Sequence, residues 1–238
     1  MGFLKANKRL SHKIERTLGF FPASEIVDEL VPEGRVADVG GGKQPLFEKT
    51  PAIRHYCGID LDAEELARAP AGTYDETIVA DITRYRGNGD FDMLICRSTL
   101  EHVKDTEKAI KGLMSLLAPG GIGYLVVPSR NSVFSYINRL MPESAKRRLL
   151  FALYPAKQTD GFPAFYDRTT PHEVSAMIEA QGGTVDQVNK IYFSGYFTFF
   201  TPLHVLWRGA AMVQKATNPN YCERFEMIFR KDSAPQTR

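Results

Sequence analysis

The middle of the chain alternates short runs of apolar and β-branched residues with segments in which apolar residues recur at helical spacing. Such alternation is typical of α/β proteins in which crossover helices join parallel strands. The seven runs that are short enough to be strands are residues 35–39, 55–59, 76–80, 91–96, 122–128, 184–191 and 225–231. We therefore expect an α/β fold built on a doubly wound, seven-stranded and mostly parallel sheet.

Capping signals mark three helices between these runs. Asp62 is a good N-cap for a helix over residues 62–69, and a helix over 106–117 ends before Pro119 and two glycines. Thr170 is followed by a proline and, three residues on, by a glutamate, which together form a capping box. This third helix is expected to end near residue 180.

The pattern contains no repeat and no interdomain linker, so we expect one domain over residues 1–238. Within it we distinguish an N-terminal helical cover (1–30), a ligand-binding core (31–130), a lid or insertion (131–170), and a C-terminal helix with the last strands (171–238). The insertion is basic and aromatic, and strand alternation is hard to find in it.

Glycines and carboxylates stand where the first strands end. The first strand runs into Gly40, Gly41 and Gly42, and acids follow the second and third strands at Asp60 and Asp81. Glycines let the backbone approach a ligand closely, and open α/β sheets bind ligands at the carboxyl ends of their strands. The sequence departs from a P-loop, because the turn lacks its first glycine and its Ser or Thr. An alternative is that the glycines only reverse the chain and the acids cap the next turns.

These segments resemble the class I S-adenosylmethionine-dependent methyltransferases. The resemblance covers residues 33–128 and rests on V-A-D-V-G-G-G, G-I-D-L-D, A-D-I, F-D-M-L-I-C-R-S-T-L-E-H-V and L-A-P-G-G, in this order. It implies the strand order 3-2-1-4-5-7-6 with an antiparallel last strand, and S-adenosylmethionine as cofactor. The cofactor contacts that it implies are Asp38, Gly40, Gly41, Gly42, Asp60, Leu61, Asp81, Ile82, Cys96 and Arg97.

One position of the glycine turn departs from the family pattern. Gln44 stands where the family has its third glycine. A nicotinamide-dependent oxidoreductase, the alternative enzyme class, needs a pyrophosphate cradle that this turn does not provide. S-adenosylmethionine has no phosphate, and the departure is therefore easier to reconcile with a methyltransferase.

His102 is our candidate catalytic base. Glu101 and His102 follow the fourth strand, and the ubiquinone-type O-methyltransferases that they resemble carry E-x-x-E-H here. The first glutamate of that motif is Ser98 in this chain, so we predict no metal. We expect O-methylation of a small, glycan or lipid-linked acceptor, with His102 accepting the hydroxyl proton. The alternatives are that Glu101 and His102 cap the following helix, and that the protein is a non-catalytic scaffold that binds the cofactor.

An aromatic segment over residues 162–168 precedes the capping box, where an active-site lid would lie. Tyr166 and Arg168 are its candidate acceptor contacts. The segment is similar to one in methyltransferases that act on glycans or polyprenyl-linked intermediates. The alternative is a packed surface loop.

Three stretches combine basic and aromatic residues: 3–21, 133–154 and 192–207. In the first, Phe3, Leu10, Ile14, Leu18 and Phe21 share one helical face; in the second, Lys146, Arg147 and Arg148 are flanked by apolar residues. Such surfaces can rest in an anionic headgroup layer. They can equally be a helix over the sheet, a substrate channel or a homodimer contact.

Composition limits the remaining partners. The 30 basic and 28 acidic residues leave a net charge of +2, which argues against a nucleic-acid binder. The longest uncharged stretch, 191–207, has only 17 residues and is interrupted by glycine and proline. The N-terminus resembles no cleaved signal, and the three distant cysteines suggest neither disulfides nor zinc. We predict a cytoplasmic location, with the inner face of the membrane as an alternative.

Overall fold

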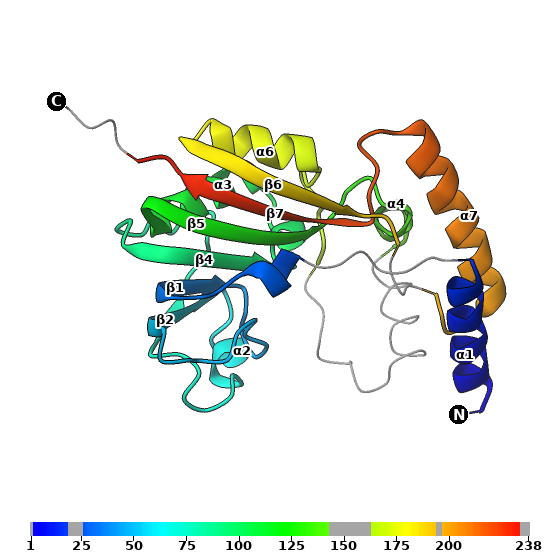
Figure 1. Cartoon of the computed structure of the whole chain (residues 1–238), viewed down its shortest axis with the longest axis horizontal. Coiled ribbons are helices and arrows are strands. Elements are labelled where there is room, and N and C mark those ends of the chain that lie inside the picture. Colours follow the sequence, from blue (N-terminus) through cyan, green and yellow to red (C-terminus); the bar gives the residue numbers. More distant parts are fainter. Residues whose placement is uncertain (1, 19–25, 143–162, 194–196, 234–238) are drawn as a thin grey trace.

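The fold is a seven-stranded sheet with both faces covered and a pair of helices, α1 (Gly2–Thr17) and α7 (Thr201–Thr217), beyond the carboxyl ends of the strands (Figure 1). The computed structural model describes residues 2–18, 26–142, 163–193 and 197–233. The strand order is 3-2-1-4-5-7-6, and β7 runs antiparallel to both of its neighbours, which confirms the predicted fold class. The strands are β1 Gly34–Val39, β2 Ile53–Asp60, β3 Glu76–Val79, β4 Phe91–Arg97, β5 Leu117–Pro128, β6 Gly183–Ile191 and β7 Arg224–Lys231.

The strand register brings the predicted site residues to one edge. Val39, the last residue of β1, pairs with Ile59 of β2 and with Cys96 of β4. Asp60 follows Ile59, and Arg97 follows Cys96. The glycine turn, the end of β2 and the end of β4 therefore lie side by side, as parallel pairing requires.

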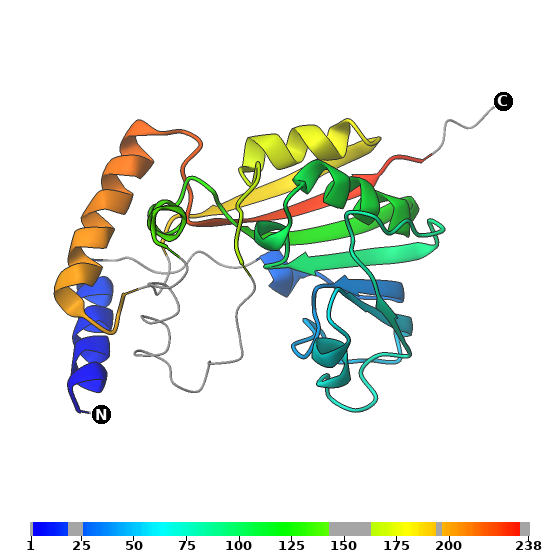
Figure 2. The ribbon, with the colours of Figure 1, turned by 180° about the vertical axis from the view of Figure 1, so that it is seen from behind.

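Two clusters of buried apolar residues, one on each face of the sheet, form the core. Helices α3 (Thr106–Leu116) and α6 (Pro171–Glu179) cover one face, as Figure 2 shows. The 3₁₀ turn η1 (Ile26–Glu29) and the loop after β1 cover the other, where Ile26 packs against Val36 and Tyr56. Because both faces of the central strands are buried, their sequences are nearly continuous runs of apolar residues.

The expected helix starts agree with the structure. Helix α2 (Ala63–Ala67) has Asp62 as its N-cap, whose side chain accepts from the Glu64 amide. At α6 the Thr170 hydroxyl caps the helix by accepting from the Glu173 amide at 3.3 Å, and it donates to the Glu173 carboxylate at 2.6 Å.

The structure differs from the expected pattern around β5. This strand begins at Leu117, five residues before the predicted start, because α3 runs into it without a loop. The proline and glycines that ended the helix in the sequence pattern lie inside the strand, next to a register shift opposite Phe91. They act as a bulge, which interrupts strand pairing locally without ending the strand.

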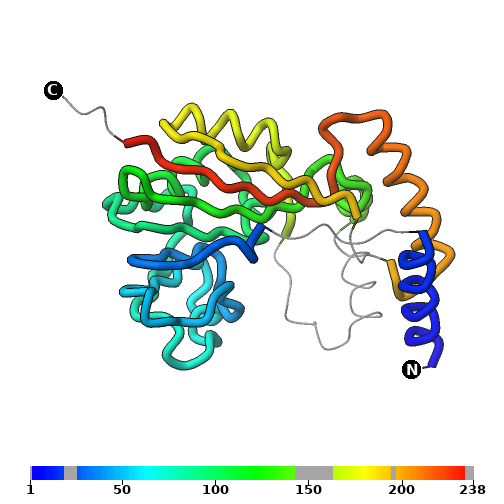
Figure 3. Tube along the Cα trace, viewed as in Figure 1, coloured from blue at the N-terminus to red at the C-terminus, as the bar shows by residue number. Residues whose placement is uncertain are grey.

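Two helices were not predicted, and a third lies away from the sheet. The unpredicted helices are α4 (Val133–Leu140), within the expected insertion, and α7 (Thr201–Thr217), between β6 and β7. Helix α1 (Gly2–Thr17), from the expected N-terminal cover, packs against α7 instead of the sheet (Figure 3). Because α7 follows β6 and precedes β7, this helix pair stands at the carboxyl edge. Phe21, the basic triplet at 146–148 and Phe162 lie outside the described residues.

Candidate functional site

The turn after β1 takes a backbone shape that needs glycine. Gly40 has a φ of +74° and Gly42 a φ of +46°, in the left-handed region that a Cβ disfavours. A Cβ at Gly40 would also overlap the Thr99 side chain behind β4. Any other residue at Gly40 would therefore have a strained backbone and would also clash with Thr99, just after the end of β4.

Asp38 is buried beneath this turn, with 1% of its surface exposed. Its Oδ2 accepts from the hydroxyls of Tyr56 at 3.0 Å and Tyr74 at 3.2 Å, and from the Leu46 amide at 3.3 Å. Burial raises the pKa of Asp38, and these three hydrogen bonds oppose the rise. A Cβ at Gly41 would overlap the carboxylate. Asp38 thus fixes the loop on both sides of the turn.

Asp60 ends β2 beside the same turn. Its Oδ1 accepts from the Asp62 amide at 3.0 Å, and its Oδ2 lies close enough to Gly42 that a Cβ there would come within 3.1 Å. Burial raises the pKa of Asp60, and the nearby Glu65 and Asp62 carboxylates raise it further. Leu61, the next residue, is 65% exposed at this edge.

The other predicted cofactor contacts divide between the edge and the core. The Asp81 Oδ1 accepts from the amide of Thr83 at 2.9 Å and from its hydroxyl at 2.7 Å, so this carboxylate also organises the turn after β3. The side chains of Ile82 and Cys96 are buried in the core, and burial raises the pKa of the Cys96 thiol. Arg97 instead donates to the Gln44 carbonyl at 3.0 Å across the glycine turn.

A cavity of about 380 Å³ opens beside the glycine turn, within the size range of small-molecule and cofactor sites. It is lined by Gly40, Gly41, Lys43, Gln44, Glu65, Arg97, Ser98, Val126 and Arg224. The residues fit S-adenosylmethionine. Glycines leave room for a closely approaching chain, Asp60 stands at the end where a ribose would lie, and three cationic side chains can meet the carboxylate of the methionine part.

Glu101 and His102 lie in the 3₁₀ turn η2 (Leu100–His102) after β4. The Nδ1 of His102 lies 2.9 Å from the Pro163 carbonyl oxygen, which can only accept, so Nδ1 carries the proton. The Nε2 lies 3.8 Å from Oε1 of Glu101. In the neutral ring Nε2 is then the basic nitrogen.

Glu101 is a functional candidate to which the sequence prediction gave no catalytic role of its own. It is 4% exposed, and within the described part of the chain its Oε2 has no hydrogen-bond partner. Burial raises its pKa to about 8. A buried carboxyl with a raised pKa beside a histidine is a candidate for a functional site. The signal available in the sequence was its place, directly before His102 and directly after a strand.

The segment before α6 fastens onto this turn. The amides of Phe165 and Tyr166 donate to the Glu101 carbonyl at 2.7 and 3.1 Å. Tyr166 is 4% exposed, and burial raises the pKa of its phenol, close to Ser135 of α4. Arg168 points elsewhere, since it pairs with Glu107 of α3 at 3.1 Å. The segment brings Tyr166 to the Glu101–His102 turn and leaves Arg168 on the outside.

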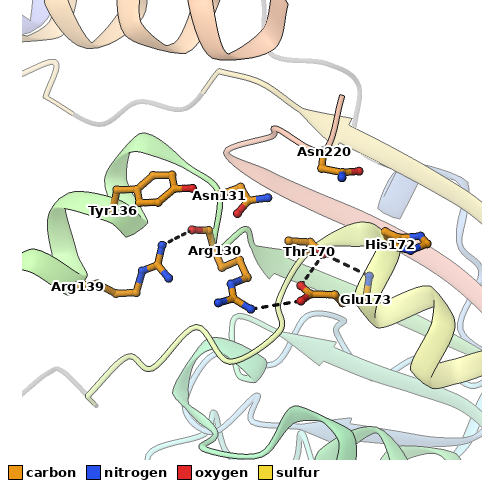
Figure 4. A pocket seen from close by; sticks show the side chains of 8 residues that line it. All are labelled: Arg130, Asn131, Tyr136, Arg139, Thr170, His172, Glu173 and Asn220. Atoms are coloured by element: carbon orange, nitrogen blue, oxygen red, sulfur yellow. Dashed lines mark hydrogen bonds and ion pairs between the residues drawn. The ribbon is translucent and has the colours of Figure 1, made fainter. Parts of the chain in front are cut away.

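A second cavity, of about 450 Å³, lies at the carboxyl edge between α4, the start of α6 and the loop before β7 (Figure 4). Two arginines dominate it. Arg139 donates to the Arg130 carbonyl at 2.9 Å, and Arg130 pairs with Glu173 at 3.3 Å. The remaining lining residues are Asn131, Tyr136, Thr170, His172 and Asn220. The cavity is polar and can accept an oxygen-rich or anionic group.

The described residues hold neither a cluster of metal ligands nor a helix that could span a membrane. No three metal-ligating side chains of the His, Cys, Asp or Glu type come together there, and Cys57, Cys96 and Cys222 are free and buried. Within the same residues, every helix is too short or too polar to cross a membrane.

Comparisons with known proteins agree with this architecture. A family model described as a methyltransferase domain matches residues 5–187. The ubiquinone biosynthesis O-methyltransferase of Ralstonia nicotianae is 34% identical over 107 residues, which cover 41% of this chain and 44% of that protein. The chain thus spans about half the length, or less, of the first curated relatives that it matches.

Two solved structures share the fold at low identity. An S-adenosylmethionine-dependent methyltransferase from Methanosarcina mazei superposes with a TM-score of 0.52 at 17% identity, covering 90% of this chain and all of that one. The [4+2]-cyclase SpnF gives 0.52 at 16% identity, covering 95% of this chain and 82% of that one. The family match spans well over half of the chain, and the strand order and glycine turn agree with it. The chain belongs to the methyltransferase domain family and has the fold of the class I S-adenosylmethionine-dependent methyltransferases.

Proposed function

We propose that the protein binds S-adenosylmethionine at the glycine turn and transfers its methyl group to a hydroxyl oxygen of an acceptor. The observation that carries the proposal is the meeting, at one sheet edge, of the glycine-lined cavity with the Glu101–His102 turn. Cofactor and acceptor sites on neighbouring strand ends allow the two reactants to be held in line. Such orientation can supply on the order of 7 kcal/mol or more of the barrier reduction.

The cofactor contacts follow from the placement of each side chain. Asp60 accepts hydrogen bonds from the ribose hydroxyls with the oxygen that faces Gly42. Arg97 and Lys43 attract the carboxylate of the methionine part. Asp38 acts through the turn that it holds, because its carboxylate is already bonded to two tyrosines. Ile82 and Cys96 contribute backbone, since their side chains belong to the core.

His102 accepts the proton of the acceptor hydroxyl at Nε2. Bound S-adenosylmethionine supplies a methyl carbon already activated by the sulfonium. The acceptor oxygen forms the new bond to that carbon, and the carbon–sulfur bond breaks with its electrons kept by sulfur. The Pro163 carbonyl holds the proton on Nδ1, so that Nε2 keeps its lone pair for the base role. A positioned general base adds about 10²- to 10⁴-fold.

The second cavity suits the acceptor. Its two arginines and the amides of Asn131 and Asn220 favour a hydroxyl-rich or anionic group, as glycans and phosphate-linked lipids carry. Tyr166 lies between α4 and the Glu101–His102 turn and would line the path between this cavity and the base. We therefore propose a small-molecule or lipid-linked acceptor with such a group.

Two measurements test the proposal. Calorimetry with S-adenosylhomocysteine should detect binding to the wild-type protein, and Asp60→Ala should weaken that binding by about 10²-fold, since hydrogen bonds to a charged group contribute roughly 1.5–3 kcal/mol each. Equal binding by wild type and Asp60→Ala contradicts the cofactor site.

The second measurement follows label transfer from S-adenosylmethionine to lipid, glycan and phenol extracts. His102→Gln should bind S-adenosylhomocysteine normally and transfer about 10²-fold more slowly or worse. Cofactor binding without any transfer, together with a copurifying protein, would replace the enzyme by the scaffold alternative.

A further inference from the structure

The α1–α7 layer, meaning the helices Gly2–Thr17 and Thr201–Thr217, has polar side chains on its inside. The Thr201 amide donates to Asn7 Oδ1 at 3.0 Å, and the Ser11 and Thr201 hydroxyls lie 3.1 Å apart. Glu15 Oε1 accepts from Arg208 Nε at 2.8 Å and lies 2.9 Å from His204 Nε2. Helix pairs in water normally bury their apolar faces. Here hydrogen bonds and an ion pair link the two helices.

The side of α7 that faces away from α1 is uncharged. Its residues at helical spacing are Pro202, Leu206, Gly209, Val213 and Ala216, and all of them are exposed. Leu206 is 72% exposed, Val213 62% and Met212 48%. Isolated exposed apolar residues are common, whereas a continuous stripe marks a contact surface.

Helix α1 adds exposed apolar residues and positive charge to the same layer. Phe3 is 66% exposed and its ring lies 6.5 Å from that of Phe200, at the start of α7, while Leu10 is 50% exposed. The opposite side of α1 carries exposed basic residues, namely Lys5, Arg9, Lys13 and Arg16. The two helices hold seven lysines and arginines against one acid, Glu15, although the whole chain is nearly balanced at 30 to 28.

We propose that the α1–α7 layer docks on an anionic lipid surface, with the α7 stripe and Phe3 among the lipid chains and the α1 cations at the headgroups. Basic residues beside an exposed apolar face are the signature of helices that lie in a membrane interface. Charge complementarity decides between this occupant and a second copy of the chain. Two copies joined through this surface would bring their basic α1 helices together, whereas anionic lipid neutralises them.

The docking surface stands at the functional edge of the sheet. Helix α7 joins the carboxyl end of β6 to the start of β7, and Arg224 at that start lines the cofactor cavity. Asn220, in the same connection, lines the arginine-rich cavity. Both cavities therefore lie at the end of the sheet where this layer stands. The docking is independent of the methyl transfer and would hold even if the protein had another activity.

Flotation of the full chain with lipid vesicles tests the proposal. We expect binding to phosphatidylcholine vesicles that contain phosphatidylglycerol, little binding to phosphatidylcholine alone, and about a tenfold or larger loss in high salt. Leu206→Glu combined with Val213→Glu should reduce binding about tenfold or more, because it places charge in the apolar stripe. Lys5→Glu combined with Arg9→Glu should do the same and should lose the salt dependence.

The matched control is Val31→Glu. Val31 is a 76% exposed valine just before β1, at the opposite edge of the sheet, and its substitution should leave vesicle binding unchanged. Circular dichroism and S-adenosylhomocysteine binding verify that each variant is folded. Absence of wild-type binding at low salt, or equal binding by the Leu206/Val213 variant, overturns the proposal. A dimer in solution that this variant dissociates, without vesicle binding by the wild type, would assign the surface to a second copy.

Discussion

The cofactor edge and the α1–α7 layer use polar residues in opposite ways. At the cofactor edge, buried polar groups shape the backbone for a ligand: Asp38 bonds two tyrosines, and the glycines above it adopt left-handed conformations. In the α1–α7 layer, polar groups join two helices to each other, and apolar residues such as Leu206 and Val213 stay exposed. In the first region the buried polar groups shape the proposed cofactor site. In the second they leave the apolar stripe of α7 exposed, which is the surface that we propose contacts lipid.

The two regions also differ in how they are anchored. The strands of the cofactor edge are fixed by backbone pairing on both sides of β1. Helix α1 is instead held by side-chain contacts with one face of α7. A change at the cofactor edge should therefore be felt throughout the fold, and a change in the layer should be felt locally.

Gly40→Val is expected to have the largest effect. Valine would face both an unfavourable φ of +74° and the Thr99 side chain. Strain and overpacking each cost about 1–3 kcal/mol, so affinity for S-adenosylhomocysteine should fall about 10³-fold, with a lower melting temperature. The control is Gly72→Ala, where φ is +80° but a Cβ meets nothing within 4 Å. If both variants bind equally well, the packing of the turn against β4 is unimportant.

Glu101→Gln should change how stability depends on pH. The folded pKa of about 8 lies above the ordinary 4.5, so the folded state holds a proton that the unfolded state loses. The free energy of unfolding is therefore highest below about pH 4.5 and falls as the pH rises toward about 8. The fall is at most a little over 1 kcal/mol for each pH unit. Glutamine does not titrate, so the stability of the variant should not fall in this way.

Urea unfolding of both proteins across this pH range measures the effect. From the acidic to the alkaline end, the free energy of unfolding of the wild type should decrease by a few kcal/mol more than that of Glu101→Gln. The effect is large because the Glu101 side chain is only 6% exposed. Parallel stability curves for the two proteins would mean that Glu101 is ionised in the fold at neutral pH, and its role beside His102 would have to be revised.

The sequence predicted the sheet well because its strands are buried on both faces. Apolar runs of the right length identified all seven strands, and the capping residues Asp62 and Thr170 identified two helix starts. The start of β5 was missed because Pro119 and two glycines stop a helix in most contexts, and here they sit in a strand bulge. Helix α7 was missed because its buried residues mix Thr201, His204 and Arg208 with apolar ones while leucine and valine lie exposed, so that no apolar stripe marks a buried face.

The site was predictable only as far as it is local. The sequence placed Gly40, Gly42 and Asp60 at one edge of the sheet because the end of a strand fixes where they lie. The partners of Asp38 come from β2 and from the loop before β3, so the sequence could not tell whether its carboxylate faces a ligand or a tyrosine. The Glu101 carbonyl accepts from the amides of Phe165 and Tyr166, more than 60 residues away, and no spacing rule reveals that contact.

Glu15→Ala should have the smallest effect of the three, and a local one. It removes the carboxylate that holds Arg208 and His204, which are 7% and 0% exposed. Breaking a fully buried pair costs about 3–5 kcal/mol, but Arg208 keeps the rings of Phe193 and Trp207 within 5 Å, so we expect about 2 kcal/mol. The control is Glu64→Ala, whose pair with Arg68 is exposed and should contribute under about 1 kcal/mol. Limited proteolysis should cut Glu15→Ala faster near α1, while its affinity for S-adenosylhomocysteine stays at the wild-type value. A fall in that affinity would mean that the layer supports the cofactor edge, and the two regions would then have to be treated as one.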